Sequence, residues 1–471
     1  MAVAAAAATF GALRQGVRTS DVPSVLRAMR KNNFLASDLN GLSRGTNDLG
    51  AAVAASAAQK AAVVYDLDAL RGSFAALRDA FPEHWTHALA IKAAPLAFVV
   101  REAVDAGLGV EAASYGEAAS ALANGCPRER VVFDSPAKTV DELRWALDAG
   151  IAVNADSLDE LARIDAVLAE RSAPSASLLG LRVNACVDGK GEHAIFAVSE
   201  NDSKFGHPLS SDAMRAAVVD AFGAYPWLRA LHTHVGSAGT SLDMLAQGAS
   251  TLAGLADEID AAAGGRRVEA LDIGGGLASS MASDETSPTF AEHAACLREA
   301  APSLFTRDDR AVFTELGRAL LQKTAWIVSQ VEYVKAFDGS PTRIATLQVG
   351  ADLLMRQCYR PELATNRITA YDADAEPLAA GGRGAAVEHH LAGPLCFAGD
   401  YPQKGVALPP LAGGDYVVFH DTGANSLALW SRHCSRLVPP VYSYTRDAAG
   451  AVELVLQKPA EPLERLLEFW S

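Results

Sequence analysis

Residues 130–157, RVVFDSPAKTVDELRWALDAGIAVNADS, decide the fold of this chain. Two short strand-like runs, RVVFDS at 130–135 and AVNADS at 152–157, enclose a stretch of helical periodicity, TVDELRWALDAG at 139–150. A strand, a helix and a second strand in so short a segment are typical of a sheet whose neighbouring strands run parallel.

The same unit repeats on both sides of this segment. The series opens with a strand-like run at 63–66 and a helical stretch at 66–81. Eight strand-like runs follow: HALAIK (87–92), LGVEAAS (108–114), RVVFDS (130–135), AVNADS (152–157), LLGLRVN (178–184), LRALHTHVGS (228–237), VEALDIGGG (268–276) and AVFTELG (311–317). Helical stretches lie between most of them, which predicts an α/β fold of the TIM type, a (β/α)8 barrel. A doubly wound sheet is the alternative, and the lack of a GxGxxG pattern after the first strand disfavours it.

The character of the sequence changes near residue 320. Strand-like runs continue, but few long helices separate them, and Pro and Gly interrupt this part. The runs are 325–337, 343–349, 415–423 and 452–459. We therefore expect three parts: an Ala-rich N-terminal extension at 1–60, part of which can join the β-rich domain, the barrel at 61–320, and a β-rich domain at 321–471.

The first 34 residues contain five basic residues against one acid, Asp21, in an Ala-rich context. This composition occurs in organelle transit peptides, and equally in an Ala-rich helix followed by a linker. Both interpretations stay open. We expect a cytoplasmic protein, or an organellar one if this segment is a transit peptide.

Composition excludes several classes of protein. Half of the 471 residues are hydrophobic and 21% are charged, as in ordinary globular proteins. The 41 Lys and Arg against 56 Asp and Glu give a net charge of −15, which disfavours a nucleic-acid partner. Six cysteines without a CxxC pair disfavour a disulfide framework and a zinc ribbon. No apolar run is long enough to span a membrane.

Polar residues gather where the predicted strands end, which is the face of a barrel that carries its chemistry. Lys92 closes the first run. Removal from water would lower the pKa of this amine and make it a nucleophile for an aldehyde, whereas a lysine that reaches to solvent is the alternative. Further polar residues at strand ends are Glu111 to Ser114, Asp134, Ser135, Asp156, Arg182, Asn184, His234 to Ser237 and Glu315.

Gly274, Gly275 and Gly276 follow the seventh run, and Gly317 and Arg318 follow the eighth. Glycine lets backbone N–H groups approach a phosphate, and arginine adds charge-assisted hydrogen bonds. Barrels commonly bind phosphate after strands seven and eight. An aldehyde-binding lysine and a phosphate site on one face together suggest pyridoxal 5′-phosphate (PLP).

Glu315 and His234 complete this hypothesis. An ionised Glu315 would keep the pyridine nitrogen of PLP protonated, and His234 would pack flat against the ring. The alternative for His232 and His234 is a metal pair, but it needs further ligands that the sequence does not identify, so we expect no metal.

From about Tyr65 to Tyr444 the chain resembles the fold-type III PLP-dependent decarboxylases, and among them the diaminopimelate decarboxylases. The resemblance rests on motifs that are weak singly and specific together. They are YDLDAL, AIKA, the Glu111–Glu117 segment, LRVN, SKFG, HVGS, DIGGG, ELGRAL, GPLCFAGD and the GAN segment near residue 424.

The resemblance implies a role for each matching residue. Lys92 would form the Schiff base with PLP, His234 would stack on the ring, and Glu315 would hold the pyridine nitrogen. Cys396 would reach the active site of a second subunit and protonate the carbanion, which implies a homodimer with shared active sites and a β domain beside the barrel. The implied phosphate site comprises Ser237, Gly274, Gly275, Gly276, Gly317, Arg318 and Asn425.

The departures from the family bear on the substrate. The resemblance implies decarboxylation of an amino acid to an amine, nominally meso-diaminopimelate to lysine in lysine biosynthesis. In that branch an acid follows the cysteine and binds the distal ammonium, but this chain has Phe397, and Asn425 replaces a tyrosine that contacts phosphate. An unpaired ammonium costs on the order of 1–3 kcal/mol or more.

Another substrate, such as a carboxynorspermidine-type amino acid, therefore stays open. Further candidates for substrate contacts are Asp352, Arg356, Tyr359 and Asp400. A racemase and a catalytically silent regulatory homologue are less favoured. The β domain and the GPLCFAGD segment argue against the first, and the retention of Lys92, Glu315, Arg318 and Cys396 argues against the second.

Overall fold

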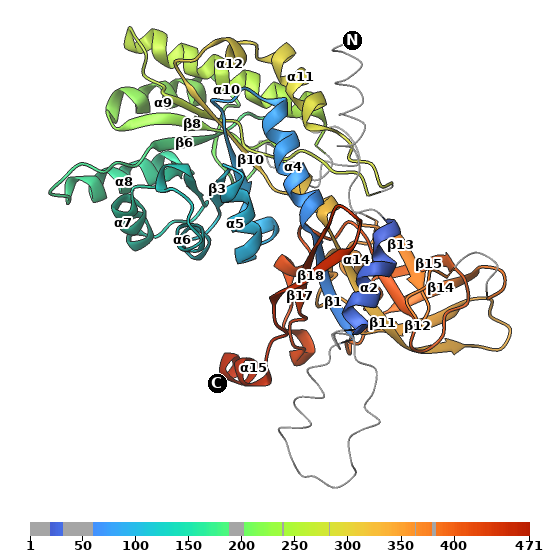
Figure 1. Cartoon of the computed structure of the whole chain (residues 1–471). Coiled ribbons are helices and arrows are strands. Elements are labelled where there is room, and N and C mark those ends of the chain that lie inside the picture. Colours follow the sequence, from blue (N-terminus) through green and yellow to red (C-terminus); the bar gives the residue numbers. More distant parts are fainter. Residues whose placement is uncertain are drawn as a thin grey trace. The chain divides into compact units, whose positions relative to one another are not determined.

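The computed structural model describes residues 19–31, 60–187, 202–237, 240–281, 283–362, 364–378 and 383–471 (Figure 1). The chain divides into two compact units. We call residues 71–280 and 286–320 the barrel unit, and residues 1–70, 281–285 and 321–471 the β-rich unit.

The barrel unit is a closed ring of eight parallel strands, which confirms the predicted fold. In ring order the strands are β5 (Ala152–Ala155), β4 (Val131–Asp134), β3 (Gly109–Ala112), β2 (Thr86–Ala90), β10 (Ala311–Leu316), β9 (Ala270–Asp272), β8 (Leu228–His232) and β6 (Leu179–Asn184). Pairing of β5 with β6 closes the ring, so a doubly wound open sheet is excluded. The short strand β7 (His207–Pro208) pairs with β6.

Helices alternate with these strands along the chain. The longer ones are α4 (Leu67–Ala80), α5 (Ala97–Asp105), α6 (Tyr115–Ala123), α7 (Val140–Ala149), α8 (Leu158–Ala169), α9 (Asp212–Ala224), α10 (Leu242–Ala263) and α11 (Phe290–Ala300), and α12 (Ser303–Thr306) and α13 (Arg318–Leu321) are short.

The sequence of helix α7 itself contains the signals for where the helix begins, where it ends and which face is buried. Thr139 and Glu142 form a capping box at its start, and Gly150 ends it in the left-handed conformation. Leu143 and Leu147 are buried one turn apart, so a single apolar stripe packs against the barrel. Both ends and the buried face are therefore encoded within residues 139–150.

The β-rich unit contains a nine-stranded mixed sheet. Its strands are β1 (Ala61–Asp66), β11 (Ala325–Ala336), β12 (Arg343–Leu347), β13 (Ile368–Tyr371), β14 (Val387–Ala392), β15 (Gln403–Leu408), β16 (Tyr416–Phe419), β17 (Val441–Arg446) and β18 (Val452–Lys458). The helices are α2 (Val22–Lys31), α14 (Met355–Tyr359) and α15 (Leu463–Trp470). Among the helices of the described residues, none combines the length and apolar character that a membrane crossing requires.

Strand β1 differs from our expectation, which placed it in the barrel domain at 61–320. It pairs antiparallel with β11 and parallel with β17, both in the β-rich unit. All six of its residues are buried. Its first four residues are apolar, and such a run fits the centre of any sheet, so the pattern alone cannot tell which sheet will take it.

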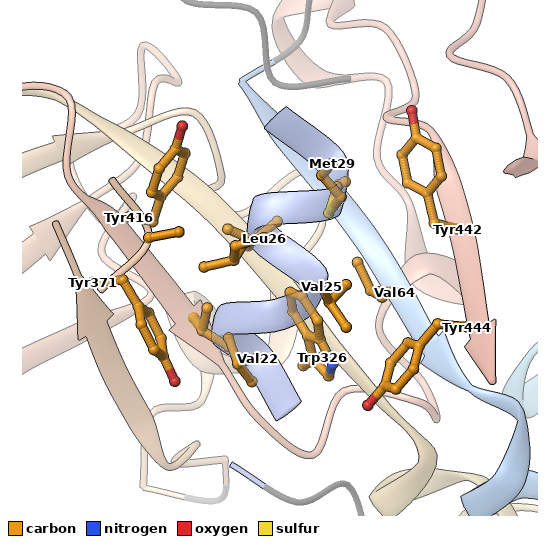
Figure 2. Packing of buried hydrophobic residues seen from close by; sticks show 14 residues of the cluster. Val22, Val25, Leu26, Met29, Val64, Trp326, Tyr371, Tyr416, Tyr442 and Tyr444 are labelled. Carbon is orange, nitrogen blue, oxygen red and sulfur yellow. The ribbon is translucent and has the colours of Figure 1, made fainter. Parts of the chain in front are cut away.

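Helix α2, within the predicted N-terminal extension, is part of the core of the β-rich unit (Figure 2). Val22, Val25, Leu26 and Met29 lie on its buried face and pack in one cluster with Trp326 of β11. A transit peptide that included this helix would remove core residues on cleavage. The Ala-rich residues before Thr19 lie outside the described residues.

Candidate active site

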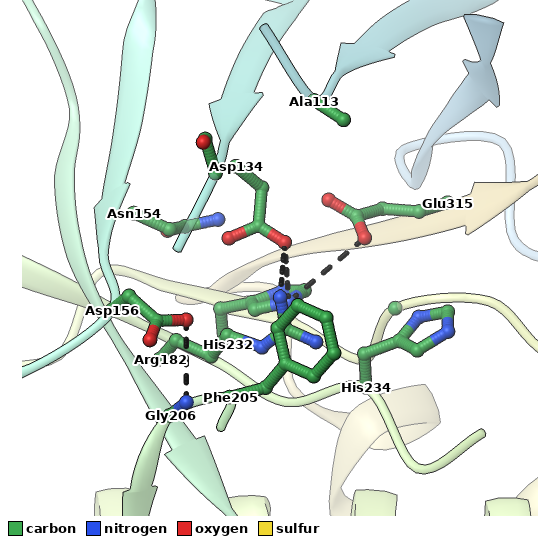
Figure 3. A network of polar contacts seen from close by, with 12 residues as sticks. Ala113, Asp134, Asn154, Asp156, Arg182, Phe205, Gly206, His232, His234 and Glu315 are labelled. Carbon is green, nitrogen blue, oxygen red and sulfur yellow. Dashed lines mark hydrogen bonds and ion pairs between the residues drawn. The ribbon is translucent and has the colours of Figure 1, made fainter. Parts of the chain in front are cut away.

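Residues at the carboxyl ends of five barrel strands converge in a buried polar cluster (Figure 3). They are Asp134 of β4, Arg182 of β6, His232 of β8, Asp272 of β9 and Glu315 of β10. Parallel strands in a closed ring bring these ends together although they are far apart in the sequence.

Lys92 lies in the short turn η3 (Ile91–Ala93) directly after β2, and its Nζ forms an ion pair with Glu111 of β3. The Lys92 side chain is 47% exposed, whereas that of Glu111 is fully buried. Burial lowers the pKa of Lys92, but the carboxylates of Glu111, Glu315 and Asp134 outweigh burial and raise it. The expected lowered pKa is therefore wrong, because the surrounding carboxylates favour the ammonium form of Lys92.

Glu111 is placed to accept a proton from Lys92. Burial raises the pKa of the Glu111 carboxyl, while the ammonium of Lys92 opposes this shift. A carboxylate of raised pKa in contact with an ammonium is a suitable acceptor for the proton that Lys92 must lose before it can bond an aldehyde.

Glu315 lies near the end of β10, and the pKa of its carboxyl is shifted by its surroundings. Burial raises its pKa well above the usual value, and Asp272, Glu111 and Asp134 add to the shift, while His232 opposes it. Oε1 of Glu315 is buried and has no hydrogen-bond partner among the described residues, so it is available to a ring nitrogen.

His234 is a neutral imidazole. Burial lowers its pKa well below the usual value, and the charges of Arg182 and Lys92 lower it further. The N–H of Gly275 donates to Nδ1 of His234 over 3.1 Å, which leaves the ring proton on Nε2. A flat, neutral ring fits the predicted stacking role.

The glycines after β9 are required for close packing. Gly274 and Gly276 have φ of 68° and 103°, and a Cβ at Gly275 would overlap the carbonyl oxygen of Glu315. The N–H of Gly274 donates to Asp272 Oδ1 over 2.9 Å, and the N–H of Gly275 is used by His234. Two of the three N–H groups are thus engaged within the chain, and phosphate contacts of the loop stay a prediction.

Ser237, Gly317 and Arg318 also lie in the barrel unit. Ser237 follows β8, and its carbonyl accepts from Thr240. Gly317 lies close to Ala90, directly before the Lys92 turn, and to Ala93, the last residue of that turn, so it adjoins the turn. Arg318 begins α13 and is half-buried. These positions agree with a site built around the ends of β2, β8, β9 and β10.

Sequence reasoning missed Lys138 and Phe205. The Lys138 ammonium is fully buried, donates to the carbonyls of Ser135 and Asn154 over 2.6 and 2.8 Å, and so joins the ends of β4 and β5. The Phe205 ring lies 4.6 Å from the guanidinium of Arg182. A lysine four residues after a strand gives no sequence signal for burial, and Phe205 was noted only as part of SKFG.

Asp134, His232 and Glu315 bring their ligand atoms within 4.8 Å of one another, a spacing that a metal ion could use. Their charges are instead balanced within the protein, because Arg182 Nη1 bonds Asp134 Oδ2 over 2.8 Å and Asp134 and Asp272 flank His232. Those carboxylates, with Glu315, raise the pKa of His232 well above its usual value against the effect of burial.

The remaining predicted residues lie in the β-rich unit. Cys396 is exposed, and Phe397 beside it stacks on Tyr359, with ring centroids 5.0 Å apart and planes 17° from parallel. Arg356 is half-buried on α14, and burial lowers its pKa. Asn425 has a φ of 55°, in the left-handed region.

Asp352 and Asp400 are buried and engaged within the same unit. Asp352 Oδ2 pairs with Arg436 over 2.8 Å. Asp400 accepts from the N–H groups of Ala351 and Leu395, each over 2.6 Å, and so ties the segment before Cys396 to the loop after β12. Through these bonds both carboxylates stabilise the β-rich unit.

A family model described as the pyridoxal binding domain of pyridoxal-dependent decarboxylases matches residues 67–322. The chain belongs to the pyridoxal-dependent decarboxylase family. It is 32% identical to a diaminopimelate decarboxylase of Actinosynnema pretiosum over 85% of this chain and 87% of that one. It is 31% identical to that of Pseudomonas aeruginosa over 70% of this chain and 74% of that one.

A solved structure supports the same fold. The diaminopimelate decarboxylase of Helicobacter pylori, in complex with L-lysine, superposes with a TM-score of 0.74 at 21% identity, covering 87% of this chain and 96% of that chain. The expected family, barrel fold, decarboxylase activity and PLP cofactor are thus confirmed.

The barrel unit of this pyridoxal-dependent decarboxylase fits PLP. Lys92 offers an accessible amine for the aldehyde, and Glu315 offers an unpartnered buried oxygen for the pyridine nitrogen. His234 offers a neutral ring face. These features match the donor and acceptor groups of the cofactor.

Proposed function

We propose that this decarboxylase acts on meso-diaminopimelate and releases lysine and CO2. The observation that carries the proposal is the accessible Lys92 amine, paired with buried Glu111, in a barrel whose relatives are diaminopimelate decarboxylases. PLP, when bound, supplies an electron sink for the pair of electrons left when CO2 departs.

The residues of this chain bind the cofactor and transfer protons. Lys92 carries the cofactor, and Glu111 accepts the proton that the ammonium must release. Glu315 holds a proton at the pyridine nitrogen, and His234 supports the ring. We assign the phosphate to Ser237, Gly276, Gly317 and Arg318, with Asn425 as a further donor.

Cys396 is proposed to deliver the proton that replaces CO2 on the α-carbon. Its exposed thiol lies in the β-rich unit, whereas the lysine and the glutamates lie in the barrel unit. By resemblance to the family, we propose a homodimer in which each subunit supplies Cys396 to the barrel of its partner.

The stacked pair of Tyr359 and Phe397 favours a second candidate substrate. Two aromatic rings at the position where the branch carries an acid offer no charge to pair with a distal ammonium, although ring faces attract cations weakly. An amino acid with an apolar or less charged distal end is therefore the alternative.

The test is CO2 release by PLP-loaded protein. With meso-diaminopimelate we expect turnover that Lys92→Ala abolishes, and Phe397→Glu should lower the KM for this substrate. Mixing Lys92→Ala with Cys396→Ala subunits should restore part of the activity if the sites are shared. No release from meso-diaminopimelate, together with Lys92-dependent release from an apolar amino acid, would replace the first substrate by the second.

A further inference from the structure

His232 is surrounded by charged groups from four other barrel strands. Its Nε2 lies 3.3 Å from Asp134 Oδ2 (Figure 3). Its Nδ1 lies 3.4 Å from Asp272 Oδ1, and the side chain is fully buried. Arg182 of β6 shares the Asp134 oxygen. Neither ring nitrogen makes a hydrogen bond among the described residues, so charge attraction is what links the imidazole to these carboxylates.

The same imidazole reaches one oxygen of Glu315. Nε2 of His232 lies 3.9 Å from Oε2, whereas Oε1, the other oxygen, has no hydrogen-bond partner among the described residues. The two oxygens of the carboxyl are therefore in different environments, one facing the imidazole and one unused.

We propose that His232 is a positioning residue: lying between Asp134 and Asp272, with Nε2 3.9 Å from Oε2 of Glu315, it keeps the Glu315 carboxyl ionised and so keeps a proton on the pyridine nitrogen of PLP. A positive charge beside Oε2 stabilises the ionised carboxyl and thereby favours the arrangement in which the shared proton lies on the pyridine nitrogen. The flanking carboxylates keep His232 charged, which agrees with the raised pKa described above. His232 acts through Glu315 and needs no contact with the cofactor.

The inference rests on the cofactor and not on the identity of the substrate, so it can be tested without substrate. The variant His232→Gln keeps a polar side chain and removes the charge. In protein loaded with PLP that carries ¹⁵N in its ring, we expect the ¹⁵N chemical shift to move toward that of unprotonated pyridine. We also expect kcat to fall about tenfold, the change that accompanies one pKa unit, with little change in KM.

A double-mutant cycle separates positioning from a general structural effect. Glu315→Gln alone should displace the ring ¹⁵N shift, and adding His232→Gln should displace it no further. His293→Gln is the matched control, since His293 is a buried imidazole of the same unit that lies against the Phe81 ring. It should leave the ring ¹⁵N shift unchanged.

Two outcomes would overturn the proposal. One is an unchanged ring ¹⁵N shift in His232→Gln, and the other is an equal effect of this variant with and without Glu315. If the variant does not fold, the wild-type protein labelled with ¹⁵N-histidine gives the answer. Two protonated ring nitrogens on His232 in the PLP-loaded protein support the role, and a neutral His232 contradicts it.

Discussion

Lys92 and His234 lie in the same barrel unit, yet their pKa values move in opposite directions. Lys92 contacts the carboxylate of Glu111, and the surrounding carboxylates keep it charged against the effect of burial. His234 is buried, and the nearest charges that act on it are the cations Arg182 and Lys92, so it stays neutral. The charge on each residue is therefore set by its neighbours on other strands.

The requirement for a glycine at position 275 can be tested with single substitutions. A side chain there meets the carbonyl oxygen of Glu315, so Gly275→Ala should destabilise the barrel unit by about 1–3 kcal/mol and weaken PLP binding. Gly254→Ala is the control, because nothing lies within 4 Å of a Cβ at this position in the middle of α10, and it should stabilise by about 0.5–1 kcal/mol. Urea unfolding and PLP titration measure both. Equal stability of the two variants would contradict the packing role of Gly275.

The positions of Lys92, His234 and Glu315 could be predicted from the sequence, because strand ends in a barrel meet at one face. Their protonation could not be predicted. It depends on pairs such as Lys92 with Glu111 and His232 with Asp272, which come from different strands and become neighbours only after the ring closes. The burial of Lys138 was missed for the same reason.

Some helices and strands could be placed from their own residues, whereas others depend on partners far away in the sequence. Helix α7 lies within the predicted stretch 139–150 because its cap, its end and its apolar stripe are local. Strand β1 was placed in the wrong sheet because its partners, β11 and β17, lie more than 250 residues further along the chain. For helix α2, the sequence left a transit peptide and an ordinary helix both open. The residues that cover its buried face, such as Trp326, lie far away in the sequence.

The two faces of α2 give a prediction. Leu26 is fully buried, and Leu26→Ala should lower the free energy of unfolding by about 2–5 kcal/mol. Arg27, the next residue, is half-exposed and pairs with Glu376, so Arg27→Ala should cost at most about 1 kcal/mol. Urea unfolding of both variants tests this. A small effect of Leu26→Ala would show that the helix does not contribute to the stability of the β-rich unit.

For the whole molecule, three buried histidines predict sensitivity to acid. Burial is the main cause that lowers the pKa of His87, His293 and His420 to about 4 each. Between about pH 6.5 and 4 the unfolded chain binds protons that the folded chain does not, so stability falls as the pH falls through this window. Each histidine contributes up to about 1.4 kcal/mol per pH unit.

The measurement is the urea midpoint as a function of pH between 7 and 4.5. His293→Gln should make the fall in stability less steep, and the exposed His84→Gln should leave it unchanged. His232 acts with the opposite sign. Its raised pKa gives stability that is present below about pH 6.5 and is lost as the pH rises through the folded-state value. An equal slope in wild type and His293→Gln would contradict the assignment.

The β-rich unit is formed by residues that come before and after the barrel residues in the sequence, and this determines the order in which its strands can pair during synthesis. Strand β1 leaves the ribosome before the barrel strands, but β17, its parallel partner, follows only after them. The barrel unit is almost entirely translated by then and can close on its own local contacts. The buried strand β1 must therefore wait for its parallel partner until the barrel strands have been made, and it depends on that later segment for its protection from aggregation.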